Sequence, residues 1–442
     1  MAMTVAPHQV LQRTVPGGCE LAGASVPLAV TDEAGSVTEL AEPRAGEALL
    51  PTGGPYTLHL RDGAVVDDVH VGDLWLLAGQ SNIEGNGEWV DPTPAHPHVR
   101  VLGLDRRWHV AEEPLHEPLH AADAVRLATL DNIERRRRDE VGPRTIGTGP
   151  GLPFAVALTT ATGTPTGLVA AAHDGSTMQE WDPGARDRGG ESLYGSTWLQ
   201  VQAAGGSVTG VIWYQGESDS HPAGAATYGR ALTRLIAALR RDFHASTVIQ
   251  VQQCRLGVDP QVLVPKLPLL TDESWSRVRD LQRTGDADVV VSAVDLSLHD
   301  FIHLDRRSVQ RLGERLARAA VGEPVPSIGT LTRRGDTVEI AIGGLTVADL
   351  PARVAGVTLH VSGQPPIPLA ATLTQEDCLE VTLPQGRHPA DAAVAHAYGL
   401  APEATFHDDR DLALPGFGPL PLPRSTSHGE PPMRPVTSAR SC

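Results

Sequence analysis

The feature that most constrains the fold is an alternation of short apolar runs with segments of helical periodicity between residues 71 and 322. Five runs have the length and character of buried strands: 74–78, 167–173, 207–214, 247–252 and 288–294. Four segments have helical spacing of apolar residues: 152–160, 225–243, 275–283 and 307–320. Strands that alternate with helices form a parallel sheet covered on both faces. We therefore predict an α/β fold with a five-stranded parallel sheet flanked by helices.

Two regions without useful helical periodicity flank this central part. Residues 1–70 and 323–424 contain short segments in which apolar and polar residues alternate, separated by Gly, Pro and Asp turns. This pattern is typical of antiparallel sheets with one buried face. We predict an N-terminal β-sandwich domain at 1–70, a central α/β domain at 71–322, a C-terminal β-sandwich domain at 323–424 and a disordered tail at 425–442.

Residues 86–148 interrupt the alternation of strands and helices. They are rich in Pro, His and Arg and show little periodicity, which predicts an insertion that forms a wall or lid over the sheet edge. The run of four arginines at 135–138 lies in this insertion and is flanked by acidic residues. Such a mixed block is typical of a solvated helix face rather than of a nucleic-acid site.

Composition argues against several classes of function. The formal net charge of −17 gives a surface that repels nucleic acid and anionic membranes. No apolar run approaches the roughly 18 residues of a membrane span. The first residues have neither the basic start nor the apolar centre of a secretory signal, which predicts a cytoplasmic location. Cys19, Cys254, Cys378 and Cys442 form no Cys-x-x-Cys pair, so we expect reduced thiols and no structural metal site.

Polar clusters follow four of the five predicted strands. The first strand leads into Gly79-Gln80-Ser81-Asn82, and the second, third and fifth lead into residues 173–181, 213–219 and 295–303. The carboxyl ends of parallel strands lie at one edge of a sheet, where α/β proteins place ligands and catalytic groups. The four clusters are therefore predicted to meet in one site.

The residue types in these clusters are complementary for acyl transfer. Ser81 is the candidate nucleophile, and a serine needs a neighbouring base to take its proton. His303 can act as this base near neutral pH, and Asp300, three residues earlier, can fix the tautomer of the imidazole. The oxyanion of the intermediate needs hydrogen-bond donors. The candidates are the backbone N–H groups of Ser81 and Gly175 and the side-chain amide of Gln215.

Taken in order, four motifs resemble the sequence blocks of the SGNH hydrolase superfamily, in its sialate O-acetylesterase and acetylxylan esterase branch. The motifs are Gly79-Gln80-Ser81-Asn82, Gly175-Ser176 ahead of Trp181, Trp213-x-Gln215-Gly216-Glu217 and Asp300-x-x-His303. The resemblance implies a flavodoxin-like catalytic domain at 71–322, a serine nucleophile and no cofactor. That branch uses Gln where other SGNH enzymes place an oxyanion-hole Asn, and Gln215 stands at this position.

Two features of the site stay open at this level. Some relatives use the Glu of the Gln-Gly-Glu block as the acid of the triad, so Glu217 is a second candidate beside Asp300. The family often has Gly-Gly where this chain has Asp174-Gly175, and Asp174 could oppose the oxyanion or bind a sugar hydroxyl. Together with Asp174, we predict Gln80 and Asn82 as substrate-binding residues.

The expected function is that of a carbohydrate O-acetylesterase that acts on O-acetylated sialic acid or a similar sugar through an acetyl-Ser81 intermediate. The expected partner is a small O-acetylated carbohydrate, with no metal, nucleic acid or membrane. Two alternatives remain, an acetylxylan esterase of the same superfamily and a glycan-binding protein that has lost turnover through Asp174. A serine peptidase is less favoured, because the Gly-x-Ser-x-Gly elbow is absent around Ser81.

Other polar and aromatic residues of the clusters have structural interpretations. Three histidines are predicted to lie at strand ends with local hydrogen bonds: His173, His221 and His299. Trp181 and Trp213 are predicted to fill the core rather than to bind a sugar ring. Glu217 and Asp219 have an alternative interpretation as caps of the helix that follows them.

Overall fold

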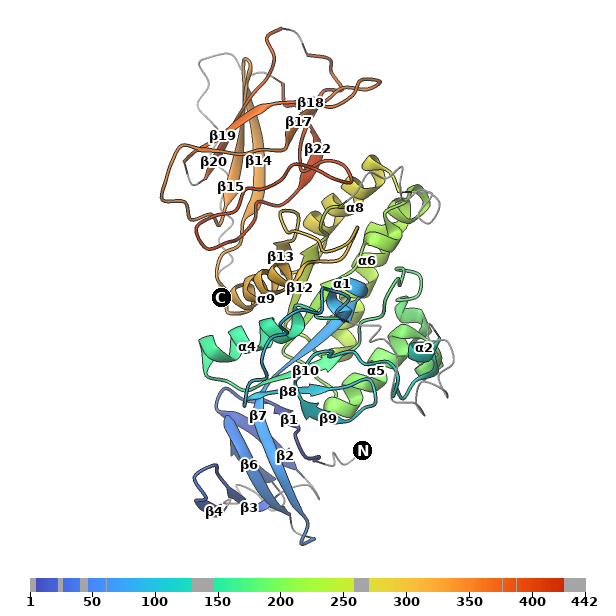
Figure 1. The fold of residues 1–442 in the computed structure, drawn as a ribbon, viewed down its shortest axis with the longest axis vertical. Helices are drawn as coiled ribbons and strands as arrows, with labels where there is room; N and C mark the ends of the chain where they lie inside the picture. Colours follow the sequence, from blue (N-terminus) through green and yellow to red (C-terminus); the bar gives the residue numbers. More distant parts are fainter. Residues whose placement is uncertain are drawn as a thin grey trace.

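A computed structural model of the chain describes residues 5–22, 27–39, 47–60, 62–128, 147–257, 270–375, 377–386 and 388–424. Three parts follow one another along the longest axis of the molecule (Figure 1). A group of N-terminal strands lies at one end, an α/β part lies in the middle, and a group of C-terminal strands lies at the other end. Among the helices of the described residues, none has the length and apolar character needed to span a bilayer.

The middle part is built on a sheet with the strand order β13-β12-β11-β7-β10-β8-β9. The five predicted strands are all present: β7 (Val65–Gly79), β10 (Thr166–Ala170), β11 (Gly210–Tyr214), β12 (Thr247–Gln252) and β13 (Val289–Ser292). Each pairs in parallel with its neighbours, so their carboxyl ends lie at one edge, as predicted. β7 lies between β10 and β11, and its last residues therefore open onto the centre of that edge.

Two further strands extend this sheet and correct the prediction of five. β8 (Val99–Leu102) pairs in parallel with β10, and β9 (Trp108–Val110) pairs antiparallel with β8. Both come from the segment for which the sequence predicts only an insertion. The apolar run of β8 is short and is interrupted by Arg100, whose Nε donates to Asp68 at 2.9 Å. The extended conformation of β8 thus depends on its pairing with β10, which local periodicity does not reveal.

Side chains alternate along the strands and divide the core into two layers. Five helices cover the sheet: α4 (Gly151–Thr162), α5 (Leu193–Ala204), α6 (Pro222–Phe243), α8 (Asp272–Thr284) and α9 (Arg306–Ala320). Trp75 and Leu77 of β7 pack in the layer of α4 and α9. Leu74, Leu76 and Ala78 pack in the layer of α5, α6 and α8. Because both faces are buried, the run 74–78 is apolar throughout.

The N-terminal strands are joined to the middle part through β7. They are β1 (Val10–Gln12), β2 (Gly18–Ala22), β3 (Pro27–Thr31), β4 (Val37–Glu39), β5 (Glu47–Pro51) and β6 (Gly53–Leu60). β6 pairs antiparallel with β7 and β1 pairs with it in parallel, both along its first half, whereas β10 and β11 pair with its second half. The domain boundary predicted at residue 70 falls inside this one strand (Figure 1).

The C-terminal strands form two antiparallel sheets that share one core. One sheet has the order β14-β15-β20-β19-β16 and the other has the order β18-β17-β21-β22. Their bounds are β14 (Ser327–Arg334), β15 (Thr337–Gly343), β16 (Ala352–Arg353), β17 (Val357–His360), β18 (Ile367–Pro368), β19 (Ala370–Gln375), β20 (Cys378–Thr382), β21 (Ala393–His396) and β22 (Phe417–Pro421). Val338 of β15 and Val394 of β21 both lie in the shared hydrophobic cluster, which is the arrangement of a β-sandwich.

A buried arginine joins this sandwich to the middle part. The guanidinium of Arg279, on α8, donates to the carbonyl groups of Gln253 and Cys254 at the end of β12. It also donates to the carbonyl groups of Ala397 and Gly399 in the C-terminal part. One fully buried cation is thus satisfied by backbone groups from both sides.

Some sequence predictions fall outside the described residues. They are the arginine run 135–138, the tail 425–442 and Cys442. The other three cysteines, Cys19, Cys254 and Cys378, are free thiols.

Candidate active site

The central strand β7 brings Ser81 to the edge of the sheet. Gly79 ends the strand with φ of +133°, and a Cβ at this position would clash with the carbonyl oxygen of Tyr214 on β11. Only glycine permits this approach, and the N–H of Gln80 donates to the same carbonyl at 2.9 Å. The chain then enters the short helix α1 (Ser81–Glu84), with Ser81 at its first position.

The loop after β13 carries a bonded imidazole and carboxylate. Nδ1 of His303 lies 2.7 Å from Oδ2 of Asp300, and the N–H groups of Ile302 and His303 donate to Oδ1 of the same carboxylate at 2.7 and 2.6 Å. Burial opposes the charge on Asp300, but these hydrogen bonds outweigh it and hold the pKa of this carboxyl below its usual range. An anionic Asp300 accepts a hydrogen bond from the N–H at Nδ1, which leaves Nε2 of His303 as the basic nitrogen.

Asn82 connects α1 to both neighbours of His303. Its Nδ2 donates to the carbonyl of Ile302 at 3.2 Å, and its Oδ1 accepts from the N–H of Leu304 at 3.2 Å. The same Nδ2 donates to Glu217 at 2.9 Å. Asn82 is only 2% exposed, so its amide joins three loops inside the protein. Substrate binding by Asn82 stays a prediction, and the buried side chain offers little surface to a substrate.

Glu217, the second candidate acid, has a different environment. Its Oε1 accepts from Asn82, and its Oε2 is buried with no partner among the described residues. Burial raises the pKa of Glu217, while the bond from Asn82 and the nearby charge of His303 lower it in part. Glu217 thus lies near the imidazole but is bonded to Asn82, whereas Asp300 is bonded to the imidazole itself.

Gln215 is paired with Asp219 inside the loop after β11. Nε2 of Gln215 donates to Oδ2 of Asp219 at 2.7 Å and to the carbonyl of Ser176 at 3.1 Å. The N–H of Met178 donates to the same carboxylate oxygen at 2.8 Å. Both amide hydrogens of Gln215 are used and its side chain is fully buried. Gln215 can therefore donate to an oxyanion only if it gives up one of these bonds.

The interpretation of Glu217 and Asp219 as helix caps is wrong. The cap of α6 is His221, whose Nδ1 accepts from the N–H of Gly224. Sequence reasoning missed the pairing of Asp219 with Gln215, although their spacing of four residues is one at which an amide and a carboxylate can meet. Asp219 therefore belongs to the framework of the candidate oxyanion loop.

Gly175 provides open space at the site. Its φ is +64°, in the left-handed region, and a Cβ there would meet no atom within 4 Å. The described residues supply no acceptor for the backbone N–H groups of Ser81 and Gly175, so both can donate to a ligand. The exposed Asp174 lies beside them, and its charge adds to burial in raising the pKa of Glu84.

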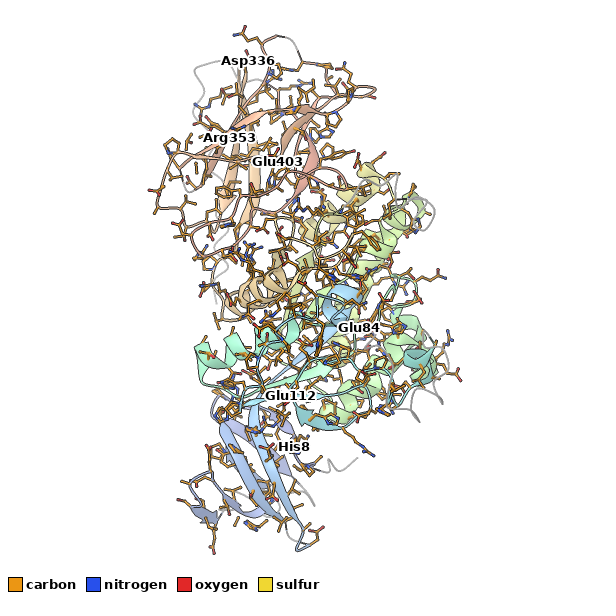
Figure 2. The ribbon with its side chains drawn as sticks, viewed as in Figure 1. His8, Glu84, Glu112, Asp336, Arg353 and Glu403 are labelled. Atoms are coloured by element: carbon orange, nitrogen blue, oxygen red, sulfur yellow. The ribbon has the colours of Figure 1, made fainter. Side chains whose placement is uncertain are left out.

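A buried carboxyl and a buried guanidinium support these loops. Glu84 ends α1 in the middle part of the molecule (Figure 2), and burial raises its pKa to about 8, against the effect of Arg126. Arg126, on the short helix α2 (Ala124–Leu127), donates to the carbonyl of Ala172 just before the second polar cluster. The sequence did not single out either residue, since neither lies in a motif of the strand ends.

Gln80 and two tryptophans belong to the framework. Oε1 of Gln80 accepts from the N–H of Gly216 at 3.4 Å and of Ser218 at 3.3 Å, and the side chain is buried, so substrate binding by Gln80 stays a prediction. Trp181 and Trp213 pack edge to face with ring centroids 5.1 Å apart in the core, which confirms the structural interpretation.

The three strand-end histidines have different surroundings. His173 is buried, and burial lowers its pKa to about 4, with the charge of Arg126 adding to the effect. His221 caps α6, as described above. His299 is partly exposed, and its Nε2 lies 3.1 Å from the carbonyl oxygen of Asn86. Local hydrogen bonds therefore fit His221 and His299, as the sequence predicted.

A cavity of about 430 Å³ adjoins the loops that carry Gly175 and Gln215. Thr177 and Met178 line it, and so does Asp219, the partner of Gln215. Arg234 of α6 and Asp182 also line the cavity and form an ion pair at 3.0 Å. The volume lies within the range of roughly 300–1,000 Å³ that is typical of small-molecule sites.

Comparisons with known proteins were made for the whole chain. Residues 71–322 match the family described as "Carbohydrate esterase, sialic acid-specific acetylesterase". A protein of Arabidopsis thaliana named "Probable carbohydrate esterase At4g34215" is 30% identical over 203 residues, which are 40% of this chain and 67% of that protein. The crystal structure of a carbohydrate acetylesterase from Xanthomonas citri matches with a TM-score of 0.63 at 20% identity, covering 94% of this chain and 98% of that chain. This similarity in structure includes the N-terminal and C-terminal strands.

Proposed function

Because the chain belongs to the carbohydrate esterase family of sialic acid-specific acetylesterases, we propose that it removes acetyl groups from sugar hydroxyls through an acetyl-Ser81 enzyme. Membership of the family supports the reaction class, an esterase that acts on acetylated carbohydrate. The proposal itself concerns which residues act as nucleophile, base and acid, and which sugar carries the acetyl group.

The proposed reaction has two halves. In the first, Oγ of Ser81 attacks the acetyl carbonyl while Nε2 of His303 takes the Oγ proton, and collapse of the intermediate releases the sugar oxygen, which receives that proton. In the second, water attacks the acetyl group on Ser81, and His303 takes one proton from the water and returns it to Oγ as acetic acid leaves, which then ionises in solution. Atoms and charges balance, and no other reactant is needed.

One observation carries this proposal. His303 is bonded to Asp300 at 2.7 Å, and Asn82, next to Ser81, bonds to the backbone on both sides of that histidine. These bonds support a base with a fixed tautomer, on a loop that Asn82 ties to the helix that begins with Ser81. In this arrangement Asp300 orients His303, and Glu217 holds the amide of Asn82.

For the oxyanion we propose the backbone N–H groups of Ser81 and Gly175 as the primary donors. Both groups are without an acceptor among the described residues, and Gly175 borders open space. Gln215 remains the third candidate, with the restriction that its amide already makes two hydrogen bonds.

The proposed donors and Ser81 do not line the cavity, but Thr177 does, two residues after Gly175. We place the part of the sugar remote from the acetyl group in this cavity and propose O-acetylated sialic acid as the substrate, with acetylated xylan as the rival. The side chain of Arg234 in the cavity lining is 67% exposed, and its partner Asp182 is 44% exposed. An exposed ion pair of this kind is worth only about 0–1 kcal/mol. A sugar carboxylate can therefore replace Asp182 at Arg234 at little cost.

The nucleophile is tested by Ser81→Ala. We expect turnover of p-nitrophenyl acetate to fall by about 10³-fold or more, with an unchanged melting temperature, because no core contact is lost. Wild-type protein quenched during turnover should carry one acetyl group on the peptide that contains Ser81. The matched control is Ser297→Ala, an exposed serine at the same sheet edge. Esterase activity near that of the wild type in the Ser81 variant would refute the proposal.

The sugar is tested by Arg234→Ala. If the cavity binds the sialate carboxylate, KM for O-acetylated sialic acid should rise by about tenfold, while KM for acetylated xylan fragments should not change. A rise for both substrates, or for neither, would contradict the assignment of the carboxylate to Arg234.

A further inference from the structure

His299 has no part in the proposed reaction, yet it lies against the carboxylate that orients the base. Its Nε2 is 3.9 Å from Oδ2 of Asp300, on which Nδ1 of His303 also converges at 2.7 Å. The two imidazole rings are stacked, with centroids 6.2 Å apart and an interplanar angle of 26°. A catalytic triad needs one imidazole on its carboxylate, and the hydrogen bond between Nε2 of His299 and the carbonyl oxygen of Asn86 accounts for the second one only in part.

The spacing of these three groups suits a transition-metal ion. One ligand atom from each of His299, Asp300 and His303 can be chosen so that all lie within 4.8 Å of one another. Zinc is bound at about 2.0–2.2 Å by imidazole nitrogen and carboxylate oxygen, in tetrahedral sites whose ligand atoms lie roughly 3.3–3.5 Å apart. The contacts of 2.7 and 3.9 Å to Oδ2 bracket that value. To bind the ion, Nε2 of His299 gives up its contact with the carbonyl oxygen of Asn86 at 3.1 Å, and Nδ1 of His303 gives up its hydrogen bond to Asp300.

The site is also accessible. The side chains of His299, Asp300 and His303 are 29%, 33% and 19% exposed, which leaves room for water as a fourth ligand. Asp300 supplies a carboxylate oxygen between the two imidazoles. Two neutral imidazoles and one carboxylate form a borderline donor set that zinc and copper prefer and magnesium does not.

We propose that His299, Asp300 and His303 form an inhibitory site for Zn²⁺ or a similar transition-metal ion, which switches the esterase off by trapping His303 in the wrong tautomer. This inference rests on the proposed role of His303 as the base. The metal takes the lone pair of Nδ1, and the Nδ1 proton moves through water to Nε2. No proton is lost and no electron is transferred, but Nε2 then carries a hydrogen and cannot accept the proton of Ser81.

The first experiment measures inhibition. Zn²⁺ should inhibit hydrolysis of p-nitrophenyl acetate by the wild type, more weakly at lower pH because protons compete for the imidazoles, and Mg²⁺ at the same concentration should not. His299→Ala should raise the concentration of Zn²⁺ for half-inhibition by about tenfold or more, while activity without metal is unchanged. The matched control is His109→Ala, because His109 pairs with Asp105 at 3.1 Å at another partly exposed position. Equal inhibition of the wild type and the His299 variant would overturn the proposal.

The second experiment measures binding without activity. Co²⁺ added to Ser81→Ala, which retains all three ligands, should give the visible absorption bands of a tetrahedral site, and His299→Ala in that background should lose them. This readout separates the two proposals. Bands that depend on His299, together with a wild type that has no esterase activity, would uphold the metal site and refute only the function. Absence of bands in an active esterase would refute the metal site and leave the function in place.

Discussion

The loops that follow β11 and β13 lie at the same edge of one sheet, yet they differ in burial. In the β11 loop, Gln215, Glu217 and Ser220 are 0–3% exposed, and their side chains bond to residues of other loops. In the β13 loop, Asp300 is one-third exposed and carries the imidazole. Position at a strand end therefore does not by itself assign a chemical role. Burial separates groups that hold the site together from groups that can exchange protons with a substrate.

The pKa shifts of the two candidate acids follow this difference in burial. Burial raises the pKa of Glu217, whereas hydrogen bonds lower the pKa of Asp300 below its usual range. An acid that is to stabilise an imidazolium must be charged at neutral pH. Asp300 meets this condition, and Glu217 is the acid whose charge the protein disfavours.

The largest expected effect comes from replacing each of the two acids, in separate variants, with its amide. Asp300→Asn should lower kcat by about 10²–10⁴, because the imidazole loses the carboxylate that fixes its tautomer. Glu217→Gln should lower kcat by less than about tenfold, because a glutamine still offers an oxygen to Asn82. Single-turnover rates and thermal melts on both variants measure the difference.

The opposite result has a clear meaning. If Glu217→Gln is the more damaging in rate while its melting temperature equals that of the wild type, Glu217 is the acid of the triad. The contrast between a supporting loop and a reactive loop would then be wrong.

An intermediate effect is expected from Gln215→Ala in the buried loop. The change leaves the carbonyl of Ser176 without its partner, which should cost about 1–3 kcal/mol, and it removes one of the two hydrogen bonds to Oδ2 of Asp219, which keeps the N–H of Met178. We expect the loss of kcat to accompany a lower denaturant midpoint. A fall of about 10²–10³ in kcat at unchanged stability would instead identify Gln215 as an oxyanion donor.

The smallest expected effect is a pair of opposite pH dependences of stability. The pKa of Asp300 is lowered from 3.8 on folding, so its contribution is present above pH 3.8 and is lost as pH falls through the lower folded value. The pKa of Glu217 is raised from 4.5, so its contribution is present below pH 4.5 and is lost as pH rises through the higher folded value.

Melting temperatures as a function of pH test this pair. The deficit of Asp300→Asn relative to the wild type should shrink as pH falls below 3.8. Glu217→Gln should gain stability relative to the wild type as pH rises above 4.5. Parallel curves for the two variants would show that the acids do not differ in their environments.

The sequence was most informative about the sheet edge. Buried parallel strands show as continuous apolar runs, and each ends in a polar cluster, so the convergence of Ser81, Gly175, Gln215 and His303 follows from local pattern and sheet geometry. The spacing of Asp300 and His303 likewise predicts their contact, which the structure has at 2.7 Å. These features depend on a few consecutive residues.

What the sequence did not reveal depends on long-range pairing. Asn82 bonds to the chain around His303, more than 200 residues away, so local spacing gives no sign of it. Glu217 was a plausible helix cap by position, but its partner is again Asn82 from another loop. β8 was missed for the same reason, since its strand neighbour is β10.

The length of β7 has a consequence for how the protein unfolds locally. A strand of 15 residues spans roughly 50 Å. Its first half pairs with β1 and β6, and its second half pairs with β10 and β11. Separating the N-terminal strands therefore strips neighbours from the strand that ends at Gly79, directly before the nucleophile. The two regions should loosen as one cooperative unit, and the amide hydrogens of β7 should exchange with solvent at a common slow rate along its whole length. A pulling force applied to the N-terminal strands would then act through β7 on the segment that carries Ser81.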